Sequence, residues 1–414
     1  MSIFDTLESQ VRSYCRNWPV VFDHASGSWL YDEDGKPYLD FFAGAGALNY
    51  GHNHPDLKQC LVDYIQRDGI THGLDMTTVA KRNFLERFQQ VVLAPRGLDY
   101  KVQFPGPTGA NSVESALKLA RKITGCESVI NFTNAFHGMT LGALSVTGNS
   151  MKRGGAGIPL VHATPMPFDN YLDGRMPDFL WFERLLDDAG SGLNEPAAVI
   201  VETVQGEGGL NVARFEWLKA LEDLCRRHEI LLIVDDVQMG CGRTGPFFSF
   251  EPAGITPDIV TLSKSISGYG LPMALTLIKP ELDVWEPGEH NGTFRGNNLA
   301  FVTAARTLET FWADDTLQKA TLDKGERINQ VLDGIAERRP GIRVKGRGLA
   351  KGLAFEQAEH AAKVCTAAFD RGMLMETAGP TDEVAKLLPP LTISDDELDQ
   401  GLQILSEAVA EVHD

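Results

Sequence analysis

Cysteine is scarce in this sequence and is not arranged for cross-linking or for metal binding. No two cysteines form a CxxC pair, and none stands at a metal-ligand spacing from a histidine. We therefore expect reduced, mostly buried thiols and no metal site. The six cysteines are Cys15, Cys60, Cys126, Cys225, Cys241 and Cys365.

Long apolar runs and an excess of basic residues are also missing. The N-terminal stretch MSIFDTLESQVRSYCRNWP has no basic region followed by a continuous apolar segment, so we expect no secretory signal, no membrane contact and a cytoplasmic location. Lys and Arg total 38 against 56 Asp and Glu, a formal net charge of −18. This balance argues against nucleic-acid partners, favours small-molecule chemistry and is compatible with a salt-stressed cytoplasm.

Repeats, low-complexity tracts and long linkers are absent as well. A chain of 414 residues with 43% hydrophobic composition can bury a sizeable core, and its length suggests one large domain and a smaller one. The apolar pattern predicts helices at 4–14, 56–68 and 357–370. Short strands are expected at 20–22, 29–31, 38–40, 102–104, 128–132, 197–201, 231–234, 259–262 and 272–278, and within 341–355 and 372–377.

Two apolar runs of this pattern each lead to a residue suited to catalysis. Residues 231–234 end in Asp235 and Asp236, and residues 259–262 lead to Lys264. Buried parallel strands present side chains at the same C-terminal edge of a sheet. A carboxylate and an amine are therefore expected to meet in one crevice.

Pyridoxal 5′-phosphate (PLP) needs such a pair. A lysine holds it as a Schiff base, and an acid lies against its ring nitrogen because a protonated pyridinium is the better electron sink. Lys264 and Asp235 suit these roles, and the apolar flank of Lys264 would favour its neutral form by desolvation. Taken singly, a surface lysine after a strand and an Asp pair that caps a helix or turn are the more common interpretations.

Three further stretches could complete such a site. FPGPTGANSVESALKLARK leads from a glycine- and proline-rich turn into an amphipathic helix, whose start binds phosphate or is merely well capped. After residues 128–132, Phe136 could stack on a ring or belong to the core. In the VQGEGG loop, Glu207 is expected at the same sheet edge or in a solvent-exposed turn.

VDDVQMGCGRTG followed by TLSKSISGYG resembles the signature of the class III aminotransferases, PLP enzymes of fold type I. The resemblance implies an α/β fold with a large domain on a mostly parallel seven-stranded sheet and a small α+β domain from both termini. The corresponding boundaries are 1–50, 51–300 and 301–414. It also implies a homodimer or higher homo-oligomer.

Several residues take roles from this resemblance. In the family, the residue that matches Asp235 contacts the pyridinium nitrogen of PLP, and the one that matches Gln238 contacts the phenolic oxygen of PLP. Val237 matches a residue that packs on one face of the PLP ring. Phe136 matches an aromatic residue that stacks on this ring, and His137 is its neighbour. Gly109 and Ala110 match the phosphate-contacting positions. Thr293 matches a threonine that donates to the cofactor phosphate of the neighbouring subunit.

The chain departs from the family at three positions. Asp236 replaces the usual glutamate, and Met139 stands where many relatives carry an arginine for a distal carboxylate. In many relatives the residue that matches Glu207 pairs with a C-terminal arginine and switches it between two substrates. Here Lys386 replaces that arginine, and lysine lacks the planar bidentate fork, so a looser carboxylate contact or a different gate is implied.

The segments GAGALNYGHNHP, THGLDMTTVAK and GTFRGNNLAFVTAA resemble the diaminobutyrate–2-oxoglutarate transaminases of ectoine biosynthesis. The implied reaction converts L-aspartate 4-semialdehyde and L-glutamate into L-2,4-diaminobutyrate and 2-oxoglutarate. Alternatives are a 4-aminobutyrate or ornithine transaminase, diaminobutyrate supply for a siderophore, and a PLP-binding module without activity. A dehydrogenase would need a glycine fingerprint after its first strand, and none is found.

Overall fold

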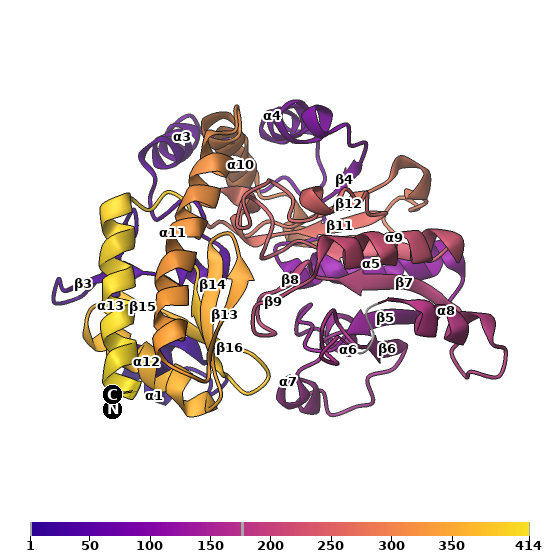
Figure 1. The fold of residues 1–414 in the computed structure, drawn as a ribbon. Coiled ribbons are helices and arrows are strands. Elements are labelled where there is room, and N and C mark those ends of the chain that lie inside the picture. The colour runs from indigo at the N-terminus through magenta and orange to yellow at the C-terminus, as the bar shows by residue number, and fades with distance from the viewer. Residues whose placement is uncertain (1, 175–177, 414) are drawn as a thin grey trace.

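A mixed sheet of seven strands lies at the centre of the larger part of the molecule (Figure 1). The computed structural model describes residues 2–174 and 178–413, and the strand order is β4-β12-β11-β10-β7-β5-β6. β12 runs antiparallel to both neighbours, whereas the other pairings are parallel. The strands are β4 (Lys101–Gln103), β5 (Ser128–Phe132), β6 (Ala163–Met166), β7 (Pro196–Val201), β10 (Leu231–Asp235), β11 (Ile259–Leu262) and β12 (Leu275–Ile278).

The central strands are apolar along their whole length because helices cover both faces of the sheet. Every residue of β7, β10 and β11 is buried, as expected for strands without a solvent-facing side. Successive residues of β10 join different clusters: Ile233 belongs with α5 (Gly109–Thr124), and Val234 with α9 (Phe215–Arg227). The sheet is therefore a middle layer whose strand ends can carry a site.

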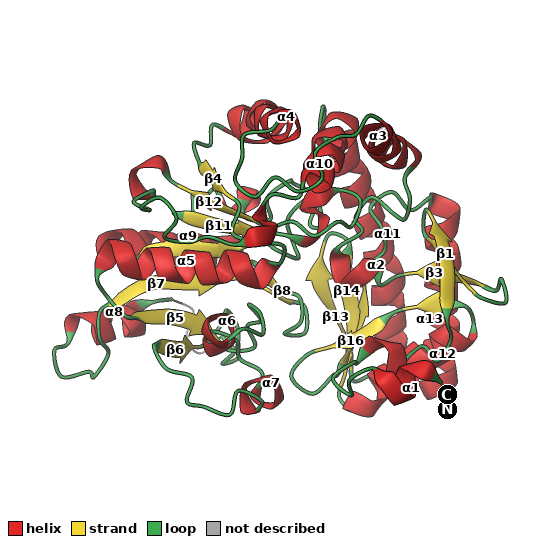
Figure 2. Cartoon of the chain, turned by 180° about the vertical axis from the view of Figure 1, so that it is seen from behind, coloured by secondary structure: helices red, strands yellow, loops and turns green. Residues whose placement is uncertain are grey.

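The smaller part combines both ends of the chain. β1 (Phe22–Ser26), β2 (Trp29–Asp32) and β3 (Pro37–Asp40) form an antiparallel meander, and β15 (Met373–Leu374) pairs parallel with β3. The two termini lie side by side in both views (Figures 1 and 2). This arrangement is the α+β unit from both termini that the sequence predicts.

A second, antiparallel sheet of the smaller part has the order β13-β14-β17-β16. Two helices, α11 and α12, pack on this sheet, and α13 packs against both of them. The elements are β13 (Ile342–Arg347), β14 (Ala350–Phe355), β16 (Glu376–Ala378), β17 (Val384–Leu387), α11 (Thr316–Arg338), α12 (Ala358–Asp370) and α13 (Asp395–His413).

The remaining elements connect these layers. The helices are α1 (Ile3–Leu7), α2 (Ala43–Gly46), α3 (Pro55–Gln66), α4 (Val79–Arg87), α6 (Leu141–Ser145), α7 (Ser150–Gly154), α8 (Leu180–Asp187) and α10 (Asn298–Phe311), and β8 (Val204–Gln205) and β9 (Asn211–Val212) form a hairpin. Short 3-10 or π segments are η1 (Tyr14–Arg16), η2 (Phe88–Leu93), η3 (Ala94–Arg96), η4 (Glu251–Ala253), η5 (Lys264–Ser267), η6 (Pro280–Leu282) and η7 (Thr293–Arg295). Within the described ranges, no helix is both long and apolar enough to cross a membrane.

The structure confirms the predicted strands of the large sheet, except that the strand predicted at 272–278 begins only at Leu275, and it corrects the N-terminus. The helix predicted at 4–14 is wrong, because α1 ends at Leu7. None of its residues is buried, and a helix without a packing partner is marginal in water. The strand predicted at 20–22 begins only at Phe22.

Candidate active site

A small cavity of about 170 Å³ lies where β7, β10 and β11 end. β10 and β11 run parallel with Asp235 opposite Thr261, so their C-terminal ends reach the same edge. Most sequence-predicted site residues meet here. The lining residues are Gly109, Ala110, Phe136, His137, Gly138, Glu202, Glu207, Asp235, Val237, Gln238, Met239 and Lys264.

Lys264 presents its amine to this cavity from a strained backbone. It begins η5 with a φ of 51°, and its Nζ donates to the carbonyl of Ala45 at 2.8 Å. Ala45 is itself left-handed, with a φ of 56°, and each such non-glycine residue costs about 1 kcal/mol. Burial lowers the pKa of Lys264, opposed by the charge of Glu207. This shift makes the neutral, nucleophilic amine easier to reach than in a solvent-exposed lysine.

Asp235 is held by three donors. Its Oδ2 lies 2.7 Å from Nδ1 of His137, and its Oδ1 accepts from Thr261 Oγ1 at 3.0 Å and from the amide of Val237 at 3.1 Å. His137 is buried, which lowers its pKa, but the hydrogen bond and charge of Asp235 outweigh this and raise it. The raised pKa favours the protonated form of His137 over that of an ordinary buried histidine, and its hydrogen bond fixes the orientation of the Asp235 carboxylate.

The start of α5 supplies the anion-binding end of the cavity. Gly109 and Ala110 are its first two residues, and the first amide groups of a helix have no acceptor within the helix. A Cβ at Gly109 would lie 2.9 Å from Cγ1 of Val237. Only glycine therefore lets the helix start approach the residue expected on the ring face.

Glu207 connects the cavity to a charged group behind it. Its Oε1 accepts from Gln238 Nε2 at 3.0 Å and from Lys386 Nζ at 2.8 Å, and Gln238 also donates to the carbonyl of Ala45 at 3.0 Å. Lys386 does not line the cavity and is fully buried. Burial opposes ionisation of Glu207, but Lys386 lowers its pKa below the ordinary range.

The family model of the class III aminotransferases matches residues 11–409. The chain is a class III aminotransferase. Proteins named diaminobutyrate–2-oxoglutarate transaminase resemble it over nearly their whole length. The one from Streptomyces anulatus is 70% identical over 411 residues, which is 99% of this chain and 98% of that protein. The one from Halalkalibacterium halodurans is 59% identical over 411 residues, or 99% and 96%.

Solved structures agree with the class III fold. An ornithine aminotransferase from Toxoplasma gondii ME49 has a TM-score of 0.85 at 27% identity and covers 99% of this chain and 94% of its own. Another structure of a Toxoplasma gondii ornithine aminotransferase, 28% identical to this chain, has PLP at partial occupancy in its active site.

The cavity of this class III aminotransferase fits the PLP on which the family depends. Among the described residues, His137 Nε2 and Gln238 Oε1 are buried polar atoms without a partner. Such atoms cost free energy unless a bound group or water satisfies them. The same cavity offers the helix start for a phosphate, Asp235 for a ring nitrogen and Lys264 for an aldehyde carbon.

Three predicted residues lie outside the cavity. Lys386 is behind it, Met139 is 54% exposed, and Thr293 is exposed with its carbonyl accepting from Nε2 of His72 at 2.6 Å. The position of Thr293 is compatible with a role toward another subunit. Met139 directly follows Gly138, which lines the cavity, and its role toward a substrate stays a prediction.

Two acidic residues near the cavity are not predicted as site residues from the sequence. Glu202 directly follows β7, lines the cavity and accepts from the amide of Phe136 at 3.0 Å. Burial raises its pKa to about 7. Glu376 lies beside Lys386 at 2.8 Å. The strand end signals Glu202, whereas Glu376 is recognisable only from the pairing of distant strands.

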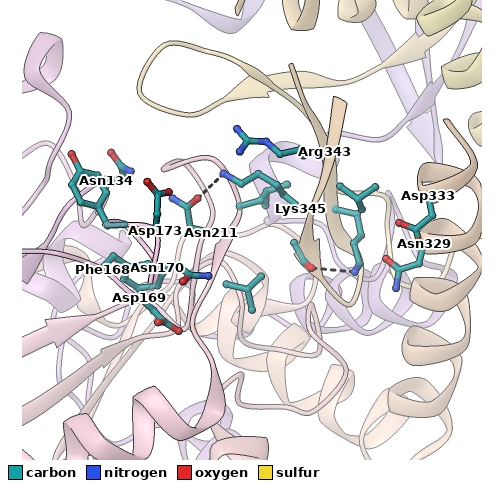
Figure 3. Close-up of a pocket in the computed structure, with 16 residues that line it drawn as sticks. Asn134, Phe168, Asp169, Asn170, Asp173, Asn211, Asn329, Asp333, Arg343 and Lys345 are labelled. Carbon is teal, nitrogen blue, oxygen red and sulfur yellow. Dashed lines mark hydrogen bonds between the residues drawn. The ribbon is translucent and has the colours of Figure 1, made fainter. Parts of the chain in front are cut away.

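A larger cleft of about 780 Å³ separates the two parts of the molecule (Figure 3). Lys345 Nζ donates to Oδ1 of Asn211 at 2.6 Å, and Lys351 donates to the carbonyl of Gly346 at 3.1 Å. Figure 3 shows Lys345 directed at Asn211, away from Asn329 and Asp333. The polar groups of this cleft therefore do not converge on one point.

Proposed function

We propose that this chain is a PLP-dependent diaminobutyrate–2-oxoglutarate transaminase. It would transfer the amino group of L-glutamate to L-aspartate 4-semialdehyde, giving L-2,4-diaminobutyrate and 2-oxoglutarate. The main observation in support is that Lys264 and Asp235 line the same small cavity. The choice of substrates is supported by relatives of that name at 70% and 59% identity over 99% of this chain.

The residues of the cavity divide the work of an amino transfer. Bound PLP supplies an electron sink next to the reacting carbon. Lys264, whose pKa is lowered by burial, can in its neutral form accept a proton from that carbon and return it. Asp235 favours a positive ring nitrogen, and His137 holds Asp235 in place. The amides of Gly109 and Ala110 would hold the phosphate, and Phe136 and Val237 would lie against the two faces of the ring.

The walls of the cavity must also exclude water. Val237, Met239 and Phe136 line it, and its central strands are buried at every residue. A dry site strengthens the attraction between Asp235 and a ring cation and protects the reacting groups from hydrolysis. Glu207 and Lys386 supply the charged wall from which substrate choice is expected to come.

The direct test is turnover of the purified chain with PLP and the proposed pair. L-aspartate 4-semialdehyde and L-glutamate should give equal amounts of 2-oxoglutarate and L-2,4-diaminobutyrate, measured by chromatography after derivatisation. The reverse reaction with 2-oxoglutarate separates L-2,4-diaminobutyrate from 4-aminobutyrate and L-ornithine as donors. A preference for either of the last two would replace the proposal with that activity.

The pathway and the assembly are part of the same proposal. The formal charge of −18 favours ectoine production in a salt-stressed cell over siderophore supply. The exposure of Thr293 supports a homodimer or higher homo-oligomer in which Thr293 donates to the partner's cofactor phosphate. Light scattering and the salt response of the producing cells would test these two points separately.

A further inference from the structure

Lys386 forms ion pairs with two carboxylates. Its Nζ lies 2.8 Å from Oε1 of Glu207 and 2.8 Å from Oε1 of Glu376. Glu376 lies on β16 directly opposite Lys386 on β17, so the backbone register of one sheet fixes this second pair. Burial disfavours a charged Lys386, but the two acids raise its pKa above the ordinary value. It therefore stays a cation.

The two acids differ in their freedom to move. Glu207 lines the cavity, has a side chain that is 18% exposed, and lies between Gly206 and Gly208 in the loop of the β8–β9 hairpin. Glu376 has a side chain that is 3% exposed, belongs to a strand and does not line the cavity. Glu207 can swing away from Lys386, whereas Glu376 is held by the sheet.

The proposed function, on which the role of Glu376 rests, needs such a difference between the two acids. Glutamate carries a carboxylate on the carbon that bears its reacting amine. The aldehyde carbon of the semialdehyde carries a hydrogen in place of that carboxylate, and the only carboxylate of the molecule lies at its far end. The wall next to the reacting carbon must therefore offer the Lys386 ammonium to the carboxylate of one substrate and keep that ammonium covered by Glu207 for the other.

We propose that Glu376 is a specificity-determining residue that anchors Lys386, so that only Glu207 moves when a substrate carboxylate enters. A lysine ammonium is a point charge on a flexible four-carbon stem, unlike the rigid fork of arginine. Without a second carboxylate to hold it, the Lys386 ammonium would move together with Glu207 and stay paired with it. With Glu376 in place, a substrate carboxylate can replace Glu207 without changing the net charge around Lys386.

The variant Glu376→Gln tests this anchor because it keeps the shape and removes the charge. Each half-reaction is followed on the PLP-loaded enzyme by the cofactor's visible absorbance, with one substrate at a time. Because burial raises the pKa of Glu376 to about 7, the assay is run at about pH 8.5, where the carboxyl is ionised.

Loss of the anchor should raise the concentration of L-glutamate that gives half the maximal rate by about tenfold or more. The half-reaction with L-2,4-diaminobutyrate should stay within about twofold, because it uses the closed pair of Lys386 and Glu207. Glu376→Asp, which keeps the charge with a shorter reach, should lie between the wild type and Glu376→Gln. Glu356→Gln changes an exposed acid after β14 and should match the wild type.

Equal losses with both donors would overturn the proposal, since Glu376 would then be a structural residue only. If Glu376→Gln does not retain PLP, the comparison of the two donors with Glu376→Asp decides, and equal losses there overturn it as well. A wild type that does not react with L-2,4-diaminobutyrate refutes the proposed function instead. In that case the anchoring role of Glu376 fails too, because it rests on the proposed function. The result for the wild type therefore shows which of the two proposals has failed.

Discussion

Two lysines of this chain are withdrawn from solvent in unlike surroundings. Lys264 lies in the small cavity of about 170 Å³, and Lys345 lines the wider cleft of about 780 Å³ between the two parts of the molecule. Burial lowers the pKa of both. A shifted pKa and a large cavity therefore do not identify the catalytic amine.

The difference lies in what each lysine faces. Lys264 shares its cavity with Asp235, Glu207 and the start of α5. The ammonium of Lys345 donates a hydrogen bond to the amide oxygen of Asn211. This bond joins β13 to the β8–β9 hairpin. Convergence of an amine, an acid and a helix start in a small space is the feature that distinguishes the candidate active site.

The strongest test of this contrast is Lys264→Ala. We expect turnover to fall by roughly 10⁴-fold or more, because both the covalent anchor and the proton carrier are lost. The visible absorption of the lysine-bound cofactor should vanish from the purified variant. A retained band with residual turnover would assign the role to another amine.

Asp235→Asn should have the next largest effect. Asparagine keeps the shape but cannot stabilise a positive ring nitrogen, so kcat should fall by about 10²- to 10³-fold while PLP stays bound. Steady-state turnover and cofactor content, measured on the same preparation, check both parts. Near-normal turnover would show that some other group supports the ring.

Thr293→Ala tests whether the small cavity is completed by a second subunit. Loss of one hydrogen bond to a phosphate should weaken PLP retention by about tenfold and leave the preference between donors unchanged. Equilibrium dialysis against free PLP measures the first, and the half-reactions measure the second. Thr366→Ala, at an exposed position of α12, is the control; an altered donor preference in Thr293→Ala alone would contradict the assignment.

Lys345→Ala should give the smallest effect. Turnover is expected to stay within about twofold, while the free energy of unfolding falls by about 1 kcal/mol through the lost hydrogen bond. Denaturant titration and steady-state kinetics separate the two. A tenfold loss of turnover with unchanged stability would show that the cleft takes part in catalysis.

Much of the fold followed from apolar runs. Residues 128–132 and 259–262 are strands with the predicted limits, because buried strands are apolar throughout and end at polar residues. The prediction of a helix at 4–14 was wrong because this segment is not buried. The apolar side chains of Phe4, Leu7 and Val11 are exposed and gain little from burial, and α1 stops at Leu7.

The sequence by itself determined which residues stand at the ends of the central strands, and so brought Lys264 and Asp235 to one edge. This was possible because parallel strands share a direction and side chains alternate along them. Only the tertiary structure decided that Lys386 is buried between Glu207 and Glu376, and that the Ala45 carbonyl reaches Lys264. These contacts depend on strand register and on left-handed turns, which packing between distant segments sets and no local pattern encodes.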